Sequence, residues 1–164
     1  MMIQKKICMI GATGVGKTSL VRQFVKSIFS EKYHSTIGVK VDKKVVRVDE
    51  NEVTMMLWDL QGEDDEFKIR PSFLRGASGY ILVIDLTRYE TLEVANLIQK
   101  MIETEFGEIP FYVLFNKNDL TDKIEISTDQ MEEFIKDSAK IMRTSAKTGE
   151  NVERAFHQLA SDII

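Results

Sequence analysis

The chain has 164 residues, of which 43% are hydrophobic and 29% are charged, and this length suits a single domain, residues 1–164. Its 22 Lys and Arg against 26 Asp and Glu give a net charge of −4, which offers no electrostatic support for binding a nucleic-acid polymer or an anionic lipid surface. Nine Gly and two Pro exclude a collagen-like or Pro-rich chain.

The single cysteine, Cys8, excludes a disulfide within the chain. It lies in an apolar run, where we expect a small buried hydrophobe in a reducing setting. Residues 1–6 lack the apolar region of a secretory signal behind their charges. No apolar stretch approaches the ~20 residues that a membrane span needs. We therefore expect a cytoplasmic protein.

The first half of the chain predicts a strand, a helix and a hairpin. Ile7–Ile10 is a strand-length apolar run, and apolar residues recur at helical spacing between residues 20 and 28. Val39–Val48 alternates loosely and meets Val53–Leu60 across residues 49–52, which is typical of a β-hairpin. The adjacent lysines 43 and 44 indicate that Val39–Val48 lies at the sheet edge.

The second half alternates predicted strands with predicted helices. Strand-length apolar runs occur at Tyr80–Asp85, Phe111–Asn116 and Ile141–Thr144. Helical periodicity covers 92–102 (Leu97 included), 131–135 after a capping box of Ser127 and Gln130, and 152–159. Apolar strands alternating with helices indicate a parallel sheet covered on both faces. We predict a three-layer α/β fold with a mostly parallel six-stranded sheet, one antiparallel edge strand and about five helices.

Residues 11–18 carry the first chemical motif. The segment Gly11-Ala12-Thr13-Gly14-Val15-Gly16-Lys17-Thr18 matches the phosphate-loop pattern G-x-x-x-x-G-K-[S/T] between a predicted strand and a predicted helix. The glycines let backbone N–H groups turn toward phosphate oxygens, and the helix start adds the positive end of its dipole. Lys17 supplies a cation and Thr18 a hydroxyl for Mg²⁺. A Gly-rich turn with a helix cap is the alternative, but the flanking elements favour a nucleotide phosphate.

Two later motifs indicate that the base is guanine. Asn116-Lys117-Asn118-Asp119 follows a predicted strand, and the Asp119 carboxylate can accept hydrogen bonds from guanine's ring N–H and its amine. Adenine lacks that pair of donors. The Lys117 stem can cover one face of the base. N-K-x-D taken alone leaves a polar turn as an alternative. The phosphate loop before it and Ser145-Ala146-Lys147 at the end of the next predicted strand favour a guanine site.

Asp59 ends a predicted strand and is followed by Leu60-Gln61-Gly62. A carboxylate at this end of the strand suits a water-mediated contact with Mg²⁺, and the Gly62 N–H can then approach a γ-phosphate. The pattern D-x-x-G alone is a common turn, so this prediction rests on its position.

These motifs in this order, together with Tyr33-His34-Ser35-Thr36-Ile37-Gly38, resemble the Ras superfamily of small GTPases. Thr36-Ile37-Gly38, Trp58 and Arg75-Gly76-Ala77 are most similar to the Rab branch. The resemblance covers essentially the whole chain and implies a P-loop G domain that binds GTP or GDP with Mg²⁺. It also implies that Phe29 lies near the base and Tyr33 over the phosphates. Thr36 would bind Mg²⁺ and the γ-phosphate, and the loops around Thr36 and Gly62 would be two switches.

The resulting expected site has three overlapping sets of residues. The expected metal ligands are Thr18, Thr36 and Asp59, and the expected catalytic residues are Lys17, Thr36, Gly62 and Glu63. Ala146 reads guanine through its backbone N–H. The full expected nucleotide-binding set is Gly11, Thr13, Gly14, Val15, Gly16, Lys17, Thr18, Ser19, Phe29, Tyr33, Thr36, Gly62, Asn116, Lys117, Asp119, Leu120, Ser145, Ala146 and Lys147.

The segment after Trp58 departs from the family. The family usually has D-T-A-G-Q there, whereas this chain has Asp59-Leu60-Gln61-Gly62-Glu63, so Glu63 holds the position of the water-orienting glutamine. A carboxylate adds repulsion beside the γ-phosphate and cannot donate to phosphoryl oxygens. We therefore expect slow intrinsic hydrolysis, with Gln61 able to substitute only if its amide reaches the water. The acidic run 63–66 is typical of a solvated loop or of a partner surface.

The leading hypothesis is a monomeric molecular switch that binds effector proteins, with an exchange factor and a GTPase-activating protein as further partners. The alternative is a GTP-binding interaction module with negligible hydrolysis, controlled by exchange or localisation. Asp119 disfavours an ATPase or kinase. Rab-like proteins usually carry a prenylated tail, and because this chain ends at Asp162-Ile163-Ile164, membrane attachment stays open.

Overall fold

The computed structural model describes residues 2–26, 39–60, 71–134 and 140–164. These residues form strands, helices and two short 3-10 helices. In chain order they are β1 Met2–Gly11, α1 Lys17–Lys26, β2 Val39–Val48, β3 Asn51–Leu60, η1 Pro71–Leu74, β4 Gly79–Asp85, α2 Glu90–Phe106, β5 Phe111–Asn116, η2 Thr121–Lys123, α3 Thr128–Phe134, β6 Ile141–Arg143 and α4 Val152–Asp162.

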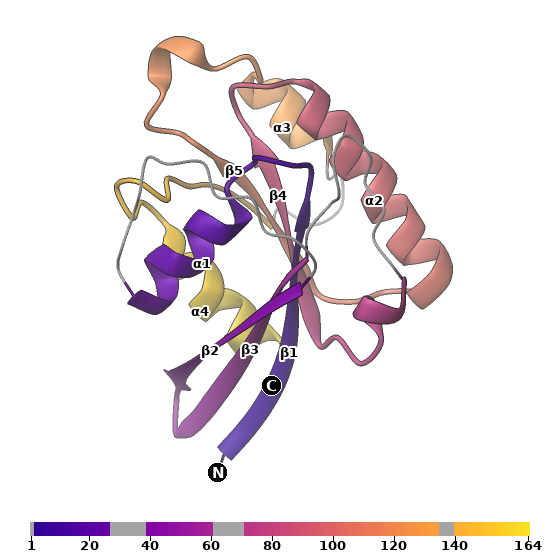
Figure 1. The fold of residues 1–164 in the computed structure, drawn as a ribbon, viewed down its shortest axis with the longest axis vertical. Helices are drawn as coiled ribbons and strands as arrows, with labels where there is room; N and C mark the ends of the chain where they lie inside the picture. The colour runs from indigo at the N-terminus through magenta and orange to yellow at the C-terminus, as the bar shows by residue number, and fades with distance from the viewer. Residues whose placement is uncertain (1, 27–38, 61–70, 135–139) are drawn as a thin grey trace.

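The strands form one six-stranded sheet in the order β2-β3-β1-β4-β5-β6. Only β2 and β3 pair in antiparallel fashion, and the other neighbours are parallel. Helices α1 and α4 lie on one side of the sheet and α2 and α3 on the other (Figure 1). The predicted three-layer, mostly parallel sheet with one antiparallel edge strand is confirmed. The described residues hold four α-helices, against about five expected for the whole chain.

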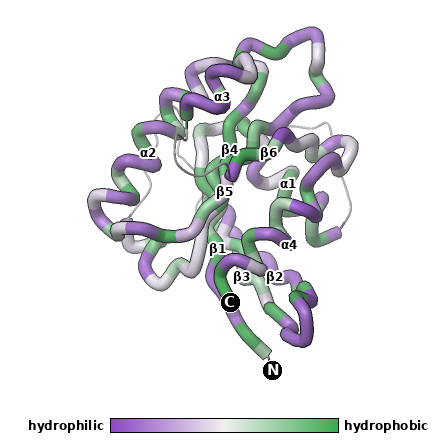
Figure 2. The backbone as a smooth tube through the Cα atoms, turned by 180° about the vertical axis from the view of Figure 1, so that it is seen from behind, coloured by the Kyte–Doolittle hydropathy of each residue, from purple (hydrophilic) through white to green (hydrophobic). Residues whose placement is uncertain are grey.

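Each face of the sheet has its own apolar core. The side chains of Leu20 and Phe24 on α1 pack with Phe156 and Leu159 on α4 over one face, and the rings of Phe24 and Phe156 stack with centroids 4.1 Å apart. On the other face, α2 and α3 pack over a second buried cluster. Between the two layers every residue of β4 is buried, and strands β4 and β5 are drawn largely in the green of hydrophobic residues (Figure 2). Burial on both faces explains why these strands are continuously apolar.

Strand β1 begins at Met2 rather than at the predicted Ile7. Residues Met2–Lys6 pair only with β3, whereas pairing with β4 begins at Ile7. The first half of the strand therefore remains partly exposed. Because it carries polar residues such as Gln4, Lys5 and Lys6, it does not form an apolar run in the sequence. Cys8, in the second half, is fully buried as expected, and burial raises the pKa of its thiol to about 12, against a small opposing effect of Lys6.

The hairpin turn is shorter than predicted. Val48 pairs with Asn51, so only Asp49 and Glu50 form the loop. Asp49 has φ 55°, a left-handed conformation that aspartate tolerates better than most residues. The last strand is also shorter than predicted, because β6 ends at Arg143 and excludes Thr144.

The described helices follow their predicted patterns with one exception, and the predicted helical positions 28 and 135 lie outside the described residues. The capping box is confirmed, since the Gln130 side chain accepts from the Ser127 N–H at 2.8 Å and the Ser127 hydroxyl accepts from the Gln130 N–H at 3.2 Å. Leu97 is 52% exposed on α2, because it lies beside the buried stripe of Ala95, Ile98 and Ile102 rather than within it. Among the described helices, none has the length and apolar character to cross a membrane.

Candidate nucleotide-binding site

The predicted motifs gather at one edge of the sheet. The phosphate loop connects the end of β1 to the start of α1, Asp59 lies near the end of β3, and Asn116 ends β5. Since β1, β3 and β5 run parallel through the same sheet, their carboxyl ends meet at this edge (Figure 1). Open parallel sheets bind ligands in this position.

The carbonyl groups of the phosphate loop are held by donors from three parts of the chain, namely α1, the turn after β4 and the end of β5. All six carbonyls from Gly11 to Gly16 accept a hydrogen bond. The donors are Lys17 Nζ to Gly11 and Ala12 (both 3.0 Å), Arg88 Nη2 to Thr13 (2.8 Å), Lys117 Nζ to Gly14 (2.9 Å), Asn116 Nδ2 to Val15 (3.0 Å) and Leu20 N to Gly16 (2.9 Å). Because the carbonyls are engaged by protein donors, the loop's N–H groups are the backbone groups suited to face an anion.

Lys17 is the buried cation of the loop, at 5% exposure. Burial lowers the pKa of its ammonium to about 8; the nearby Asp59 carboxylate opposes this shift, and the Arg88 charge adds to it. An anion beside Lys17 would stabilise the charged form. The lysine is therefore placed and charged in a way that suits phosphate binding.

Thr18 and Asp59 bring two oxygen-bearing side chains together. The Thr18 hydroxyl donates to Asp59 Oδ2 at 2.5 Å, and the Asp59 side chain is buried. Hydroxyl and carboxylate oxygens are ligands that Mg²⁺ accepts, directly or through water. The donor set therefore fits a magnesium ion next to the phosphate loop. The third expected ligand, Thr36, lies outside the described residues.

The expected base-recognition residues follow β5. Lys117 adopts φ 69°, and its ammonium reaches both the Gly14 carbonyl at 2.9 Å and Asp85 Oδ2 at 2.8 Å. Asp119 Oδ1 accepts a hydrogen bond from the Ser145 hydroxyl at 2.7 Å, which orients the carboxylate. Leu120 closes the turn by donating its N–H to the Lys117 carbonyl.

The loop after β6 is tied to both other motifs. Thr144 donates from its hydroxyl to Asn116 Oδ1 at 3.1 Å, and Gln23 on α1 donates from Nε2 to the Ala146 carbonyl at 2.7 Å. Ala146 is buried, whereas Lys147 is exposed. The structure therefore brings the phosphate loop, N-K-N-D and S-A-K into one hydrogen-bonded assembly.

Five expected site residues lie outside the described residues: Phe29, Tyr33, Thr36, Gly62 and Glu63. Of the remaining set, Val15 is buried and Ser19 is half-buried on the first turn of α1. Sequence reasoning missed Gln23, Asp85, Arg88 and Thr144, which contact the motifs without belonging to them. Of these four residues, Asp85 is the one with a signal in the sequence, because it is a carboxylate at the end of the apolar run Tyr80–Asp85.

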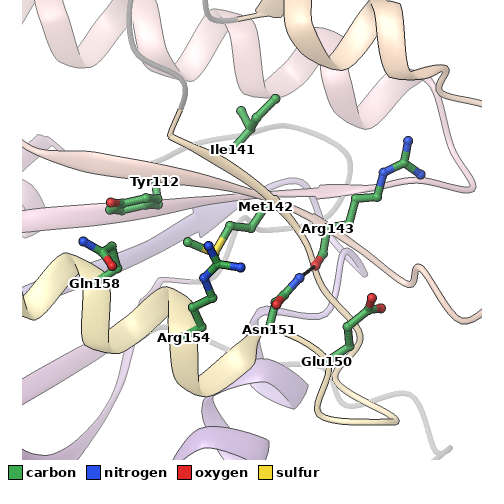
Figure 3. Close-up of a pocket in the computed structure, with 8 residues that line it drawn as sticks. All are labelled: Tyr112, Ile141, Met142, Arg143, Glu150, Asn151, Arg154 and Gln158. Carbon is green, nitrogen blue, oxygen red and sulfur yellow. Dashed lines mark hydrogen bonds between the residues drawn. The ribbon is translucent and has the colours of Figure 1, made fainter.

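A separate hollow of about 460 Å³ lies between β6 and α4. Its lining includes Tyr112, Arg143, Asn151 and Arg154 (Figure 3). Among these residues, Asn151 Nδ2 donates to the Arg143 carbonyl at 2.8 Å (Figure 3). None of the expected site residues lines this hollow, so it lies apart from the candidate nucleotide site.

The fold and the phosphate loop together define an α/β nucleotide-binding protein of the P-loop class. The chain belongs to the Ras family, whose family model matches residues 6–164. It is 34% identical to the human Ras-related protein Rab-8B over 161 residues, covering 97% of this chain and 78% of that protein. It is also 34% identical to bovine Ras-related protein Rab-8A over 160 residues, covering 96% of this chain and 77% of that protein.

These similarities place the chain near the Rab branch of the small GTPases. Proteins of this group are GTP-binding GTPase switches that use GTP, GDP and Mg²⁺. Rab-family proteins generally bind effectors, exchange factors and GTPase-activating proteins.

Proposed function

We propose that residues 1–164 form one monomeric, cytoplasmic switch domain that binds GTP or GDP with Mg²⁺, presents a nucleotide-dependent surface to effectors and hydrolyses GTP slowly. The observation that carries the proposal is the hydrogen bonding among the three motifs. Asn116 and Lys117 donate to the phosphate loop, and Ser145 donates to Asp119. A phosphate site and a purine site held together in this way suit one guanine nucleotide.

On the phosphate side, the N–H groups of residues 11–18 and the Lys17 ammonium bind the phosphate oxygens. Thr18 and Asp59 hold Mg²⁺, with Thr36 as a third ligand when GTP is bound. The ion, when bound, neutralises phosphate charge. The buried, partly desolvated setting of Lys17 supports this role, because electrostatic attraction to an anion is stronger there than in water.

On the base side, the Asp119 carboxylate accepts from the two N–H groups of guanine while Ser145 holds its Oδ1. The Ala146 N–H donates to the guanine carbonyl, and the Gln23 contact to the Ala146 carbonyl supports that role by fixing the peptide. Adenine presents an amine where guanine has a carbonyl and lacks the paired donors, so ATP would leave Asp119 without its partners.

The segments around Thr36 and Gly62 are the proposed switches, and Phe29 and Tyr33 border the base and the phosphates. In this proposal the γ-phosphate orders both segments, and its loss relaxes them. Effectors, an exchange factor and a GTPase-activating protein would bind there. The acidic residues 63–66 give this surface a negative charge that a basic partner would complement.

Slow hydrolysis is the finer part of the proposal and rests on Glu63 at the position of the usual glutamine. A carboxylate repels the γ-phosphate and has no N–H to donate to it. The same substitution supports the second candidate, a GTP-binding interaction module with negligible hydrolysis. Single-turnover hydrolysis distinguishes the two, since a measurable rate supports the switch and its absence supports the module.

The identity of the co-purifying nucleotide tests the proposal directly. Protein purified in Mg²⁺ is denatured at intervals, and the released nucleotide is identified by chromatography. We expect one guanine nucleotide per chain, with GDP indicating turnover and retained GTP indicating the near-inactive module. Displacement by excess GTP but not by excess ATP is expected in the same preparation. An empty site, or equal displacement by ATP, would overturn the proposal.

A further inference from the structure

Arg88 bridges a buried carboxylate and the phosphate loop. It follows β4 in the turn before α2, and its Nε donates to Asp85 Oδ2 at 2.9 Å. From the other end of the guanidinium, Nη2 donates to the carbonyl of Thr13 at 2.8 Å, 75 residues away in sequence. One planar group therefore connects the end of β4 to the middle of the loop, a geometry that the arginine fork supplies through two separate nitrogens.

Asp85 anchors a second, parallel connection. Its Oδ2 also contacts Lys117 Nζ at 2.8 Å, and Lys117 donates to the Gly14 carbonyl at 2.9 Å. Asp85 is fully buried, and its Oδ1 accepts from both the N–H and the hydroxyl of Thr87. Two cations on one buried carboxylate thus hold two consecutive carbonyls of the phosphate loop.

The turn that carries Arg88 is itself fixed. The hydroxyl of Thr91, which is buried, accepts from the Asp85 N–H at 3.0 Å and donates to the Arg88 carbonyl at 2.7 Å. The backbone on both sides of the guanidinium is therefore constrained. Because its backbone is already constrained, the Arg88 side chain loses little conformational entropy when it binds the Thr13 carbonyl.

The position of Arg88 also matters electrostatically. Its guanidinium donates to the Thr13 carbonyl, and the Lys17 ammonium donates to the carbonyls of Gly11 and Ala12 in the same loop. A permanent cation therefore lies near the phosphate-binding lysine. Phosphate oxygens relieve the repulsion between the two cations, so a bound nucleotide favours the closed arrangement.

We propose that Arg88 is a positioning residue that locks the phosphate loop at the Thr13 carbonyl and thereby slows nucleotide release. Neither the phosphate-loop motif nor N-K-N-D nor S-A-K contains this residue. The role rests on the proposed guanine-nucleotide binding. Release requires the loop to open, and opening then requires the hydrogen bond between Arg88 and Thr13 to break.

The test is release of a fluorescent GDP analogue from the Mg²⁺-bound protein, chased with excess GDP. We expect R88A to release the analogue about tenfold faster than the native chain, which is the effect of losing one hydrogen bond from a charged donor. R154A removes an exposed arginine of α4 and should leave the rate unchanged. F156L weakens the stacked pair of Phe24 and Phe156 and should lower the melting temperature without changing release.

Two further measurements separate the lock from a general loss of stability. The ³¹P resonance of the β-phosphate of bound GDP should shift in R88A and stay in place in F156L. R88K keeps the charge, and the single ammonium of Lys117 already contacts both Asp85 and a carbonyl of the phosphate loop. We therefore expect R88K to restore slow release in part, with a rate between those of the native chain and R88A.

Native-like release from R88A would overturn the role of Arg88 as a bridge, and so would release from R88K that is faster than from R88A. An acceleration in F156L that matches R88A would overturn it as well, because stability alone would then explain the effect. Failure of the native chain to retain guanine nucleotide would overturn the proposed function and this role together, whereas native retention with unchanged release in R88A would overturn the role of Arg88 alone.

Discussion

The side-chain amide of Asn116 donates to the carbonyl of Val15 at 3.0 Å across 101 residues of sequence. The contact packs the end of β5 against the phosphate loop, and the same amide lies close to Gly16. A Cβ placed on Gly16 would lie 2.3 Å from Asn116 Nδ2. The second glycine of the phosphate-loop motif is therefore required by a neighbouring motif as well as by the loop's own backbone.

Gly16→Ala should abolish high-affinity nucleotide binding. The added methyl group meets Asn116, whose position is fixed by Thr144 and Val15, and φ +104° is strained for alanine. We expect GDP affinity, measured by titration calorimetry, to fall at least about a hundredfold. Gly76→Ala is the matched control, because Gly76 has φ +74° but no atom within 4 Å of an added Cβ.

Gly76→Ala should therefore cost about 1 kcal/mol of stability from its backbone alone and leave GDP affinity unchanged. Equal losses of affinity in the two variants would mean that backbone strain, rather than the contact with Asn116, explains the first result.

Ser145→Ala should lower the affinity for guanine nucleotides by about tenfold. The lost hydroxyl donates to Asp119 Oδ1 at 2.7 Å, and hydrogen bonds to charged groups contribute about 1.5–3 kcal/mol. The partial exposure of Asp119 favours the lower end of that range. Competition binding with GDP measures the effect. Ser161→Ala, at an exposed position of α4, is the control, and a Ser145 variant that binds as tightly as it does would contradict the orienting role.

The sheet was predictable because burial on both faces leaves a local signature. Strand β4 is buried along its whole length, so its apolar run is continuous and easily found. The segment Met2–Lys6 lacks that signature because a neighbour lies on one side only. The helical pattern assigns Leu97 to the buried face of its helix, but the side chain is exposed. Leu97 is apolar and adjacent to the buried Ile98, so it fits the helical pattern of apolar residues although it lies outside the buried stripe.

The site was predictable only as far as its motifs are local. The residues of the phosphate loop are consecutive, so their glycines and lysine form a motif that can be recognised in the sequence. The contacts of Gln23 with Ala146 and of Arg88 with Thr13 join residues 123 and 75 positions apart. Neither side chain has an unusual sequence context, so only the packing of the elements brings these partners together.

Glu63→Gln should accelerate GTP hydrolysis. The amide can accept from the attacking water and donate to a phosphoryl oxygen, and the change removes a charge that repels the γ-phosphate. We expect the single-turnover rate to rise by about tenfold or more. Glu66→Gln removes one charge from the same acidic run and serves as the control. An unchanged or lower rate in the Glu63 variant, or an equal rise in both, would show that this position does not limit hydrolysis.

Asp85→Asn should destabilise the protein in a pH-dependent way. Burial raises the pKa of the Asp85 carboxyl, but hydrogen bonds from Lys117 and Thr87 and the Lys117 charge outweigh it, so the pKa lies below its usual value. A depressed pKa adds stability that is fully present above the unfolded value of about 4 and is lost as the pH falls through the folded value. At pH 7 the variant leaves Lys117 and Arg88 without their carboxylate. Because these two side chains are 32% and 37% exposed, solvent screening lowers the cost to about 2–4 kcal/mol, below that of a fully buried pair.

Urea unfolding from pH 7 to pH 3, with GDP and Mg²⁺ held at one saturating concentration because bound ligand adds to apparent stability, measures this difference. The gap in unfolding free energy between the native chain and Asp85→Asn should be constant above about pH 5. It should shrink below about pH 4, where the Asp85 carboxyl protonates in the unfolded chain but stays charged in the folded one. Asp122→Asn, at an exposed position of η2, should show no gap at either end. A gap for Asp85→Asn that persists unchanged to pH 3 would mean that the charge of Asp85 is not what holds Arg88 and Lys117 to the phosphate loop.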